Sequence, residues 1–225
     1  MTNHTGESVH DIRQRLSTGI PRWYNPFVYF GVTNLAGIAV IFAATRLVND
    51  VQPIEWLAIP GVFLFANFVE YMAHKGPMHH KKDLVEIVFR RHTLQHHEYY
   101  QHDSMGMESK RDCYLVFFPF WAIFLLFGVA SIPFFITWWL TNTNVAGMFL
   151  AVSVGYYLLY EWLHFAYHVP EKYWIGRTRL IRKLRQHHQA HHNRALMTKY
   201  NFNITFPICD YLFGTAFRDT KPSTK

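Results

Sequence analysis

The stretch CYLVFFPFWAIFLLFGVASIPFFITWWL, residues 113–140, contains 28 consecutive residues without a charged side chain. About 20 mainly apolar residues are enough for a helix to cross a membrane. As one helix this run would be about 42 Å long, at about 1.5 Å per residue. It therefore predicts either one tilted or kinked span, with Pro119 and Pro133 as candidate kinks, or a span joined to a short interfacial piece.

Three further blocks of the chain lack charged residues, at Phe27–Thr45, Trp56–Val69 and Val145–Tyr160. Half of the residues are hydrophobic and 18% are aromatic, yet the mean hydropathy is only −0.03. The apolar residues are thus concentrated in blocks. The pattern predicts an all-α integral membrane bundle of about four transmembrane helices, with spans at about 27–48, 54–75, 113–140 and 145–168.

The remaining segments are polar. We expect an N-terminal cytosolic arm at 1–25, a single membrane-embedded domain at 26–216 and a tail at 217–225. The arm contains Arg13, Arg15 and Arg22 and no apolar core, so it does not have the pattern of a cleavable signal peptide. The two cysteines, Cys113 and Cys209, match no metal-binding or redox spacing.

The charge distribution indicates an orientation in the membrane. Three Lys or Arg residues lie in 1–26, seven in 75–112 and eleven in 172–225, so four crossings place 21 of the 22 on one face. The positive-inside rule assigns that face, with both termini, to the cytoplasm. The net charge of +7 then suits anionic lipid headgroups, and we do not expect nucleic acid as a partner.

Thirteen of the 15 histidines fall into four groups, each at or just beyond the predicted cytoplasmic end of a span. Spacings of four residues put paired histidines on one helix face, and the Gly76-Pro77 break allows the first group to turn toward one centre. A neutral imidazole is a good ligand for iron, zinc or copper, and about ten converging imidazoles are more than one ion can use. Two metal ions are therefore expected. The groups are His74, His79 and His80; His92, His96, His97 and His102; His164 and His168; and His187, His188, His191 and His192.

Two carboxylates lie within one helical turn of these histidines. Glu70 precedes His74 by four residues, and Glu161 precedes His164 by three. An ionisable residue at membrane depth is costly and usually functional. Each carboxylate is expected either to orient an imidazole through its second ring nitrogen or to pair with a Lys or Arg side chain.

The histidine groups resemble the signature of the fatty acid hydroxylase and sterol desaturase superfamily, which consists of integral-membrane di-metal oxygenases. The family pattern, roughly H-x4-H, H-x2-HH, H-x3-H and H-x2-HH, maps onto 74–192. Arg111-Asp112 followed by LVFFP, and NFNITFPICDYLFGT at 201–215, are similar to further family segments, so the resemblance covers about 60–216. The second group departs from the pattern, because H-x3-HH is one residue longer, and this leaves the role of His92 open.

The resemblance implies a fatty acid hydroxylase-like catalytic domain, with a cytosolic His-rich helical cap that holds the di-metal centre. Three histidines and three carboxylates would support the ligands or replace one of them: His80, His102, His187, Glu70, Glu161 and Asp210. The implied ligands themselves are His74, His79, His92, His96, His97, His164, His168, His188, His191 and His192.

All-nitrogen ligation suits dioxygen activation at iron better than hydrolysis at zinc. The expected cofactors are two Fe ions, with Zn as an alternative in a purified sample, and O2 is the co-substrate. The expected reaction hydroxylates a C–H bond of a fatty acyl, sterol-like or other hydrophobic substrate at the cytosolic membrane face. Electrons would come from a separate cytochrome b5-, ferredoxin- or rubredoxin-like donor. The short chain without a fused electron carrier favours a bacterial inner membrane over the endoplasmic reticulum.

Other functions stay open at this point. A desaturase, a carotenoid hydroxylase or an aldehyde-deformylating enzyme of the same superfamily would use the same ligands and differ in how the substrate is positioned. A His-lined metal transporter would need polar residues along the spans, whereas these spans are nearly all apolar, with histidines only at their ends. A non-catalytic, metal-stabilised membrane scaffold is a third class.

Overall fold

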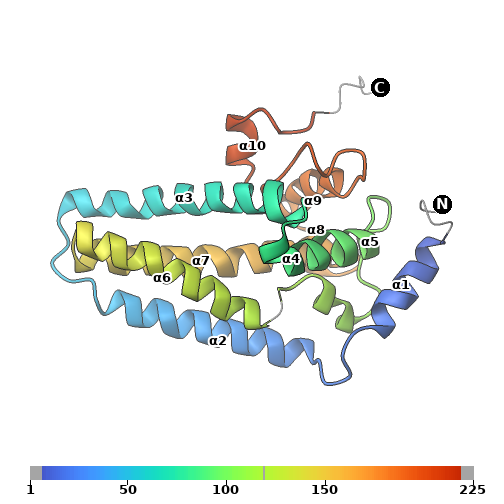
Figure 1. The fold of residues 1–225 in the computed structure, drawn as a ribbon, viewed down its shortest axis with the longest axis horizontal. Coiled ribbons are helices and arrows are strands. Elements are labelled where there is room, and N and C mark those ends of the chain that lie inside the picture. The colour runs from blue at the N-terminus through green and yellow to red at the C-terminus, as the bar shows by residue number, and fades with distance from the viewer. Residues whose placement is uncertain (1–6, 119, 219–225) are drawn as a thin grey trace.

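The computed structural model describes residues 7–118 and 120–218, and in these residues the chain is helical without a β-strand (Figure 1). The ten α-helices are α1 (Val9–Thr18), α2 (Pro26–Thr45), α3 (Ala58–Ala73), α4 (Glu86–Arg91), α5 (His97–Tyr99), α6 (Phe120–Leu140), α7 (Thr143–His168), α8 (Trp174–Arg177), α9 (Arg179–His191) and α10 (Ile208–Leu212). Three 3-10 turns lie at Pro53–Leu57, Asp83–Val85 and Lys110–Leu115, and two π-turns at His74–Met78 and His92–His96.

Four long helices, α2, α3, α6 and α7, run along the length of the molecule, and α7 packs against the other three (Figure 1). Asn142 begins α7 by accepting a hydrogen bond from the backbone N–H of Val145, and Asn25 caps α2 in the same way. At Gly147 the backbones of α7 and α2 come close together, since a Cβ there would lie 2.9 Å from the carbonyl oxygen of Ala44. Close backbone approach at small residues is typical of helices that associate in membranes.

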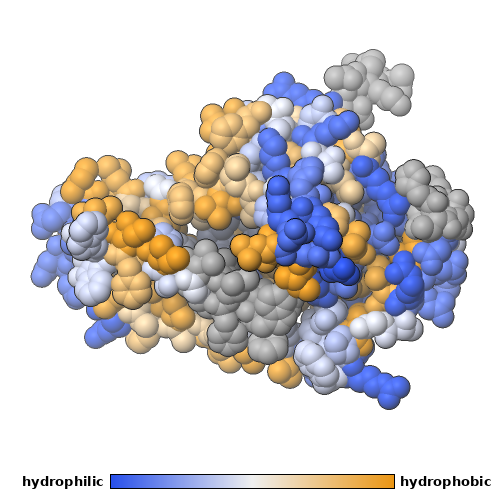
Figure 2. Space-filling view, viewed as in Figure 1, coloured by the Kyte–Doolittle hydropathy of each residue, from blue (hydrophilic) through white to orange (hydrophobic). Residues whose placement is uncertain are grey.

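Three segments of the described chain are long and apolar enough to cross a membrane, namely Pro26–Thr45, Pro53–Met78 and Thr143–His168. Their outward side chains are apolar and exposed, as Leu35 and Phe42 of α2 illustrate. Figure 2 shows this hydrophobic surface over the long helices on the left and hydrophilic surface over much of the opposite end. The chain is therefore an integral membrane protein.

The 28-residue apolar run is not one helix. Its first residues lie in the 3-10 turn Lys110–Leu115, and α6 begins only at Phe120 and spans 21 residues to Leu140. Pro133 lies inside α6, while Pro119 is outside the described residues. Of the two alternatives, a long helix accompanied by a short separate piece is the one found.

The short helices α4, α5, α8 and α9 gather at one end of the bundle, and α1 packs against α5 there (Figure 1). We call this end the cap. A buried cluster of Tyr160, Leu163 and Tyr167 from α7 with Leu184 of α9 and Ile204 fixes the cap to the bundle. The histidines lie at this junction.

Candidate metal centre

Ten buried histidines form two groups of five where the cap meets the bundle. Within each group the ring nitrogens that could bind a metal all lie within 4.8 Å of one another. The ten are the residues that the sequence predicts as ligands, including His92. The first group is His74, His79, His92, His97 and His191, and the second is His96, His164, His168, His188 and His192.

In the first group the Nε2 atoms point at one another. The Nε2 of His74 lies 2.8 Å from that of His92, and the Nε2 of His79 lies 2.9 Å from that of His191. The break at Gly76, with φ −92° and ψ −105°, turns the chain back so that the rings of His74 and His79 stack at 5.0 Å. This is the role that the sequence predicts for the Gly76-Pro77 step.

The π-turn at His92–His96 divides two neighbouring histidines between the groups. His92 and His96 are four residues apart, and their rings stack at 5.3 Å as a shared helix face predicts, but they belong to different groups. The backbone N–H of His97 bonds to the carbonyl of His92, five residues back, so His92 also aligns with His97, and their Nε2 atoms are 3.0 Å apart. π-turns occur often at functional sites. The extra residue in H-x3-HH is thus absorbed by a wider helical turn.

The second group is built around α7 and α9. His164 and His168 face it from α7, as their spacing predicts, and the Nε2 of His164 lies 3.1 Å from that of His96. His188 of α9 and His192, which caps the C-terminal end of that helix, are one turn apart, with their Nε2 atoms separated by 3.0 Å. The groups adjoin each other, since His97 of the first stacks on His192 of the second with ring centroids 4.2 Å apart.

Backbone carbonyls orient half of these rings through their second nitrogen. The Nδ1 atoms of His74 and His191 bond to the carbonyls of Phe202 and Tyr200. In the second group Nδ1 bonds join His96 to Leu115 O, His168 to Met105 O and His192 to Tyr100 O. A carbonyl can only accept, so Nδ1 carries the proton and Nε2 presents a lone pair to the centre of its group.

Burial keeps seven of the grouped histidines in the cap neutral. Loss of hydration lowers the pKa of His79 to about 2, aided by the neighbouring His191, and that of His96 to about 3. The pKa values of five more fall well below the usual 6.5 for the same first reason, with repulsion from neighbouring histidines added: His92, His97, His188, His191 and His192. Neutral imidazoles are the form that binds a metal ion.

The arrangement fits a metal ion in each group. Imidazole nitrogens bind such ions at about 2.0–2.1 Å, so ligands at right angles lie about 3.0 Å apart. The Nε2 separations of 2.8–3.3 Å match that value. The carbonyls hold the ring protons on the Nδ1 side of two rings in the first group and three in the second, so these rings present lone pairs that cannot donate to one another. A cation at each centre resolves this conflict.

The six supporting residues expected from the sequence lie outside both groups. His80 is exposed, and His102 bonds to Asp103 near the surface with a 2.8 Å distance. Glu70 does not orient His74: its carboxylate accepts bonds from the backbone N–H groups of Ile204 and Thr205. It acts on the loop whose Phe202 carbonyl holds His74, so its effect on the ring is indirect.

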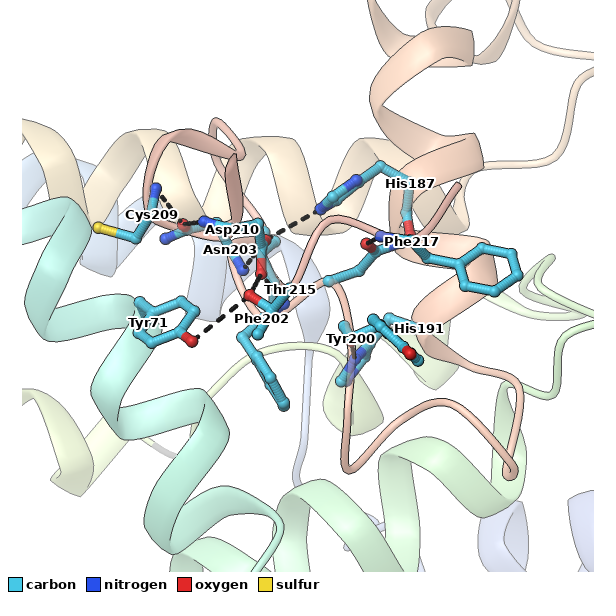
Figure 3. Close-up of polar contacts among 12 residues, drawn as sticks. Tyr71, His187, His191, Tyr200, Phe202, Asn203, Cys209, Asp210, Thr215 and Phe217 are labelled. Carbon is cyan, nitrogen blue, oxygen red and sulfur yellow. Dashed lines mark hydrogen bonds and ion pairs between the residues drawn. The ribbon is translucent and has the colours of Figure 1, made fainter. Parts of the chain in front are cut away.

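The other two carboxylates also differ from expectation. Glu161 is buried beside Tyr157, and no imidazole, Lys or Arg side chain of the described residues bonds to its carboxylate, so it neither orients an imidazole nor pairs with a cation there. Asp210 is buried and binds the loop rather than joining a group: it accepts bonds from the N–H groups of Phe202 (2.9 Å) and Asn203 (2.8 Å) and from His187 (Figure 3).

Asp112 is a site residue that the sequence reasoning missed. It is buried and accepts hydrogen bonds from Glu108 N and Ser109 N, in the segment that supplies carbonyls to the second group. Its position in Arg111-Asp112, a segment that resembles the family's, could have identified it. The backbone carbonyls that orient the rings cannot be identified from residue types, because every residue has one.

A small cavity touches both groups. His92, His96 and His164 form one wall, and the remaining walls include Phe118 and Tyr160. Its volume of about 20 Å³ has room for about one water molecule.

Comparisons with known proteins agree with this site. The sequence profile of the fatty acid hydroxylase family matches residues 59–215, which include the ten histidines of the two groups. A search of curated proteins finds no match. Among solved structures, the chain is similar to full-length scs7p, in which only the hydroxylase domain is visible, with a TM-score of 0.60 and 21% identity over 87% of this chain and 69% of that one. At that identity the likeness shows a shared fold. With more than half of its length matched by the family's profile, and with its histidines gathered as described, the chain belongs to the fatty acid hydroxylase family.

Proposed function

We propose that the protein is a membrane-bound, O2-dependent di-iron oxygenase that hydroxylates a C–H bond of a lipid. The observation that carries the proposal is the pair of adjoining groups, each with five buried imidazoles converging on one point at the end of an apolar helix bundle. The family match supports a lipid hydroxylase or desaturase type of chemistry.

The ten histidines would hold two iron ions, which bound there supply the activation of dioxygen. The chain's own contribution is to position the ligands. Backbone carbonyls fix ring tautomers, and burial excludes water from both groups. Zinc could occupy the same nitrogens in a purified sample, because it shares the preference for imidazole.

The substrate would be a fatty acyl, sterol-like or other hydrophobic molecule. The cavity beside His92, His96 and His164 is lined in part by Phe118 and Tyr160, and a hydrocarbon segment would have to widen it to reach the histidines. Exposed apolar residues on α2 and α3 support entry of such a molecule from the lipid phase. The polar end of the lipid would stay near the basic residues of the cap.

The proposed topology has four spans, α2, α3, α6 and α7, with the cap and both termini in the cytoplasm. The Lys and Arg distribution supports it, since 21 of 22 basic residues then share one side. A bacterial inner membrane is the proposed location. A separate electron-transfer protein of the cytochrome b5, ferredoxin or rubredoxin type would reduce the irons from the cytoplasmic side.

The test compares lipids from cells with and without the protein, grown under 16O2 or 18O2. The proposal expects a new lipid that contains one 18O atom, and its disappearance in His191→Ala and His164→Ala. The exposed His80→Ala is the matched control and keeps the product. A product with two hydrogens fewer and no new oxygen would instead identify a desaturase. Lipids unaffected by His191→Ala and His164→Ala, or clearly fewer than two metal ions per chain, would contradict the oxygenase proposal.

A further inference from the structure

Two buried aspartates, Asp210 and Asp112, each form the centre of a hydrogen-bonded loop beside the histidines. They are 0% and 1% exposed. Neither belongs to a histidine group. What distinguishes them is which group their loop contacts.

Asp210 holds residues 200–205 in place. Its Oδ1 accepts bonds from Phe202 N (2.9 Å) and Thr215 Oγ1 (2.7 Å), and its Oδ2 from Asn203 N (2.8 Å), as Figure 3 shows. The carbonyls of Tyr200 and Phe202 in this loop bond to the Nδ1 atoms of His191 and His74. Both histidines belong to the first group.

Asp112 does the same for residues 100–115. Its Oδ2 accepts bonds from Glu108 N (3.0 Å) and Ser109 N (2.6 Å), and its Oδ1 from Ser109 Oγ (2.9 Å). Its own carbonyl accepts a bond from the Tyr100 hydroxyl (2.9 Å). The carbonyls of Tyr100, Met105 and Leu115 bond to Nδ1 atoms of histidines that all belong to the second group, namely His192, His168 and His96.

We propose that Asp210 and Asp112 are positioning residues, each serving one of the two metal ions: Asp210 the ion of the first group and Asp112 the ion of the second. The inference rests on the proposed metal centre. Asparagine at Asp210 sets an NH2 group against a backbone N–H in either orientation of the amide, because Phe202 N and Asn203 N donate to different oxygens. Asparagine at Asp112 sets its NH2 group against the donating Ser109 hydroxyl or, in the other orientation, against two backbone N–H groups. In each place one accepting oxygen is lost, since an NH2 group cannot accept these bonds. The loop carbonyls then shift, and the rings that they orient lose their alignment. Loss of such an outer contact typically weakens metal binding by about 10–100-fold.

The experiment titrates Co2+ into the full-length, chelator-treated protein in detergent and follows its visible absorption. Wild type is expected to bind two equivalents. Asp210→Asn and Asp112→Asn are each expected to keep one site at wild-type affinity and to weaken the other by about 10–100-fold. Each variant is the matched control for the other. Equal weakening of both sites in a folded variant would overturn the proposal.

Combination with a ligand variant identifies which site is affected. His79→Ala disables the first group and His164→Ala the second. Asp210→Asn with His79→Ala should still bind one Co2+ tightly, whereas Asp210→Asn with His164→Ala should bind none tightly. The pattern for Asp112→Asn should be the reverse. The same pattern for both aspartates would contradict the assignment.

Milder variants keep the test decisive if an asparagine variant does not fold. Thr215→Val removes the 2.7 Å bond to Asp210 and a longer contact of 3.4 Å with the Tyr71 hydroxyl, and Ser109→Ala removes the 2.9 Å side-chain bond to Asp112. The same selectivity with a smaller shift is expected, and its absence would overturn the inference. If wild type itself binds fewer than two Co2+ ions, the metal centre is wrong; if it binds two and the variants are unselective, only the inference fails.

Discussion

Acid should unfold the metal-free cap with an unusually steep dependence on pH. Seven buried histidines in the cap have pKa values far below 6.5. In the unfolded cap the same residues take up protons near pH 6.5. The unfolded state therefore binds more protons, so stability is fully present above about pH 6.5 and is lost as the pH falls toward the folded pKa values.

The size of the effect follows from the number of residues. Between pH 6.5 and 5.5 each histidine lowers the free energy of unfolding by about 1 kcal/mol, because its protonation in the unfolded state rises from about half to about nine tenths while the folded state stays neutral. Seven together give about 7 kcal/mol, which is comparable with the whole stability of a typical domain at about 5–15 kcal/mol. Below about pH 5.5 the unfolding free energy should thus change with a slope that approaches seven protons.

The assay is denaturant unfolding of the chelator-treated protein in detergent at pH values between 7.5 and 5, followed by circular dichroism. His97→Gln should reduce the slope by about one proton, since His97 is one of the seven, whereas the exposed His80→Gln should leave the slope unchanged. A flat profile down to pH 5 would refute the reasoning that burial keeps these imidazoles neutral.

Three other changes test the packing and the site. Gly147→Ala should destabilise the bundle by about 1–3 kcal/mol through overpacking against α2, measured as a lower melting temperature, while Gly61→Ala, in open space, should not. Deletion of Leu94 should remove the π-turn, turn His92 away from the first group and lower the bound metal to about one ion per chain by elemental analysis; Leu94→Ala should retain two. Glu70→Gln should lower unfolding stability by about 1–3 kcal/mol, because a glutamine that keeps its oxygen on the N–H groups of Ile204 and Thr205 sets its NH2 group against the Thr205 and Tyr156 hydroxyls that donate to the carboxylate; an unchanged melting temperature would contradict the proposed hold on the loop.

The sequence alone predicts the helical membrane bundle, because its uncharged runs are long enough to span a bilayer. Histidines at the ends of those runs indicate the site, and the ten that gather in the two groups are those that the family resemblance implies as ligands. The break at Gly76 was also predictable, because Gly-Pro interrupts a helix whatever surrounds it.

The division of the histidines between the two groups was not predictable. A spacing of four residues places His92 beside His96, and their rings do stack, but the chain forms a π-turn and the spacing does not show that the two rings join different groups. The role of Glu70 depends on a loop more than 100 residues away in the chain, which no helical spacing reveals. Asp112 was missed because its function is to hold backbone groups.

The most direct measurement of the central claim is the anomalous scattering of crystals of the protein purified with iron, recorded on either side of the iron absorption edge. If the ten histidines hold two iron ions, two iron peaks are expected, one inside the five Nε2 atoms of the first group and one inside those of the second. A single peak, or peaks away from these histidines, would contradict it.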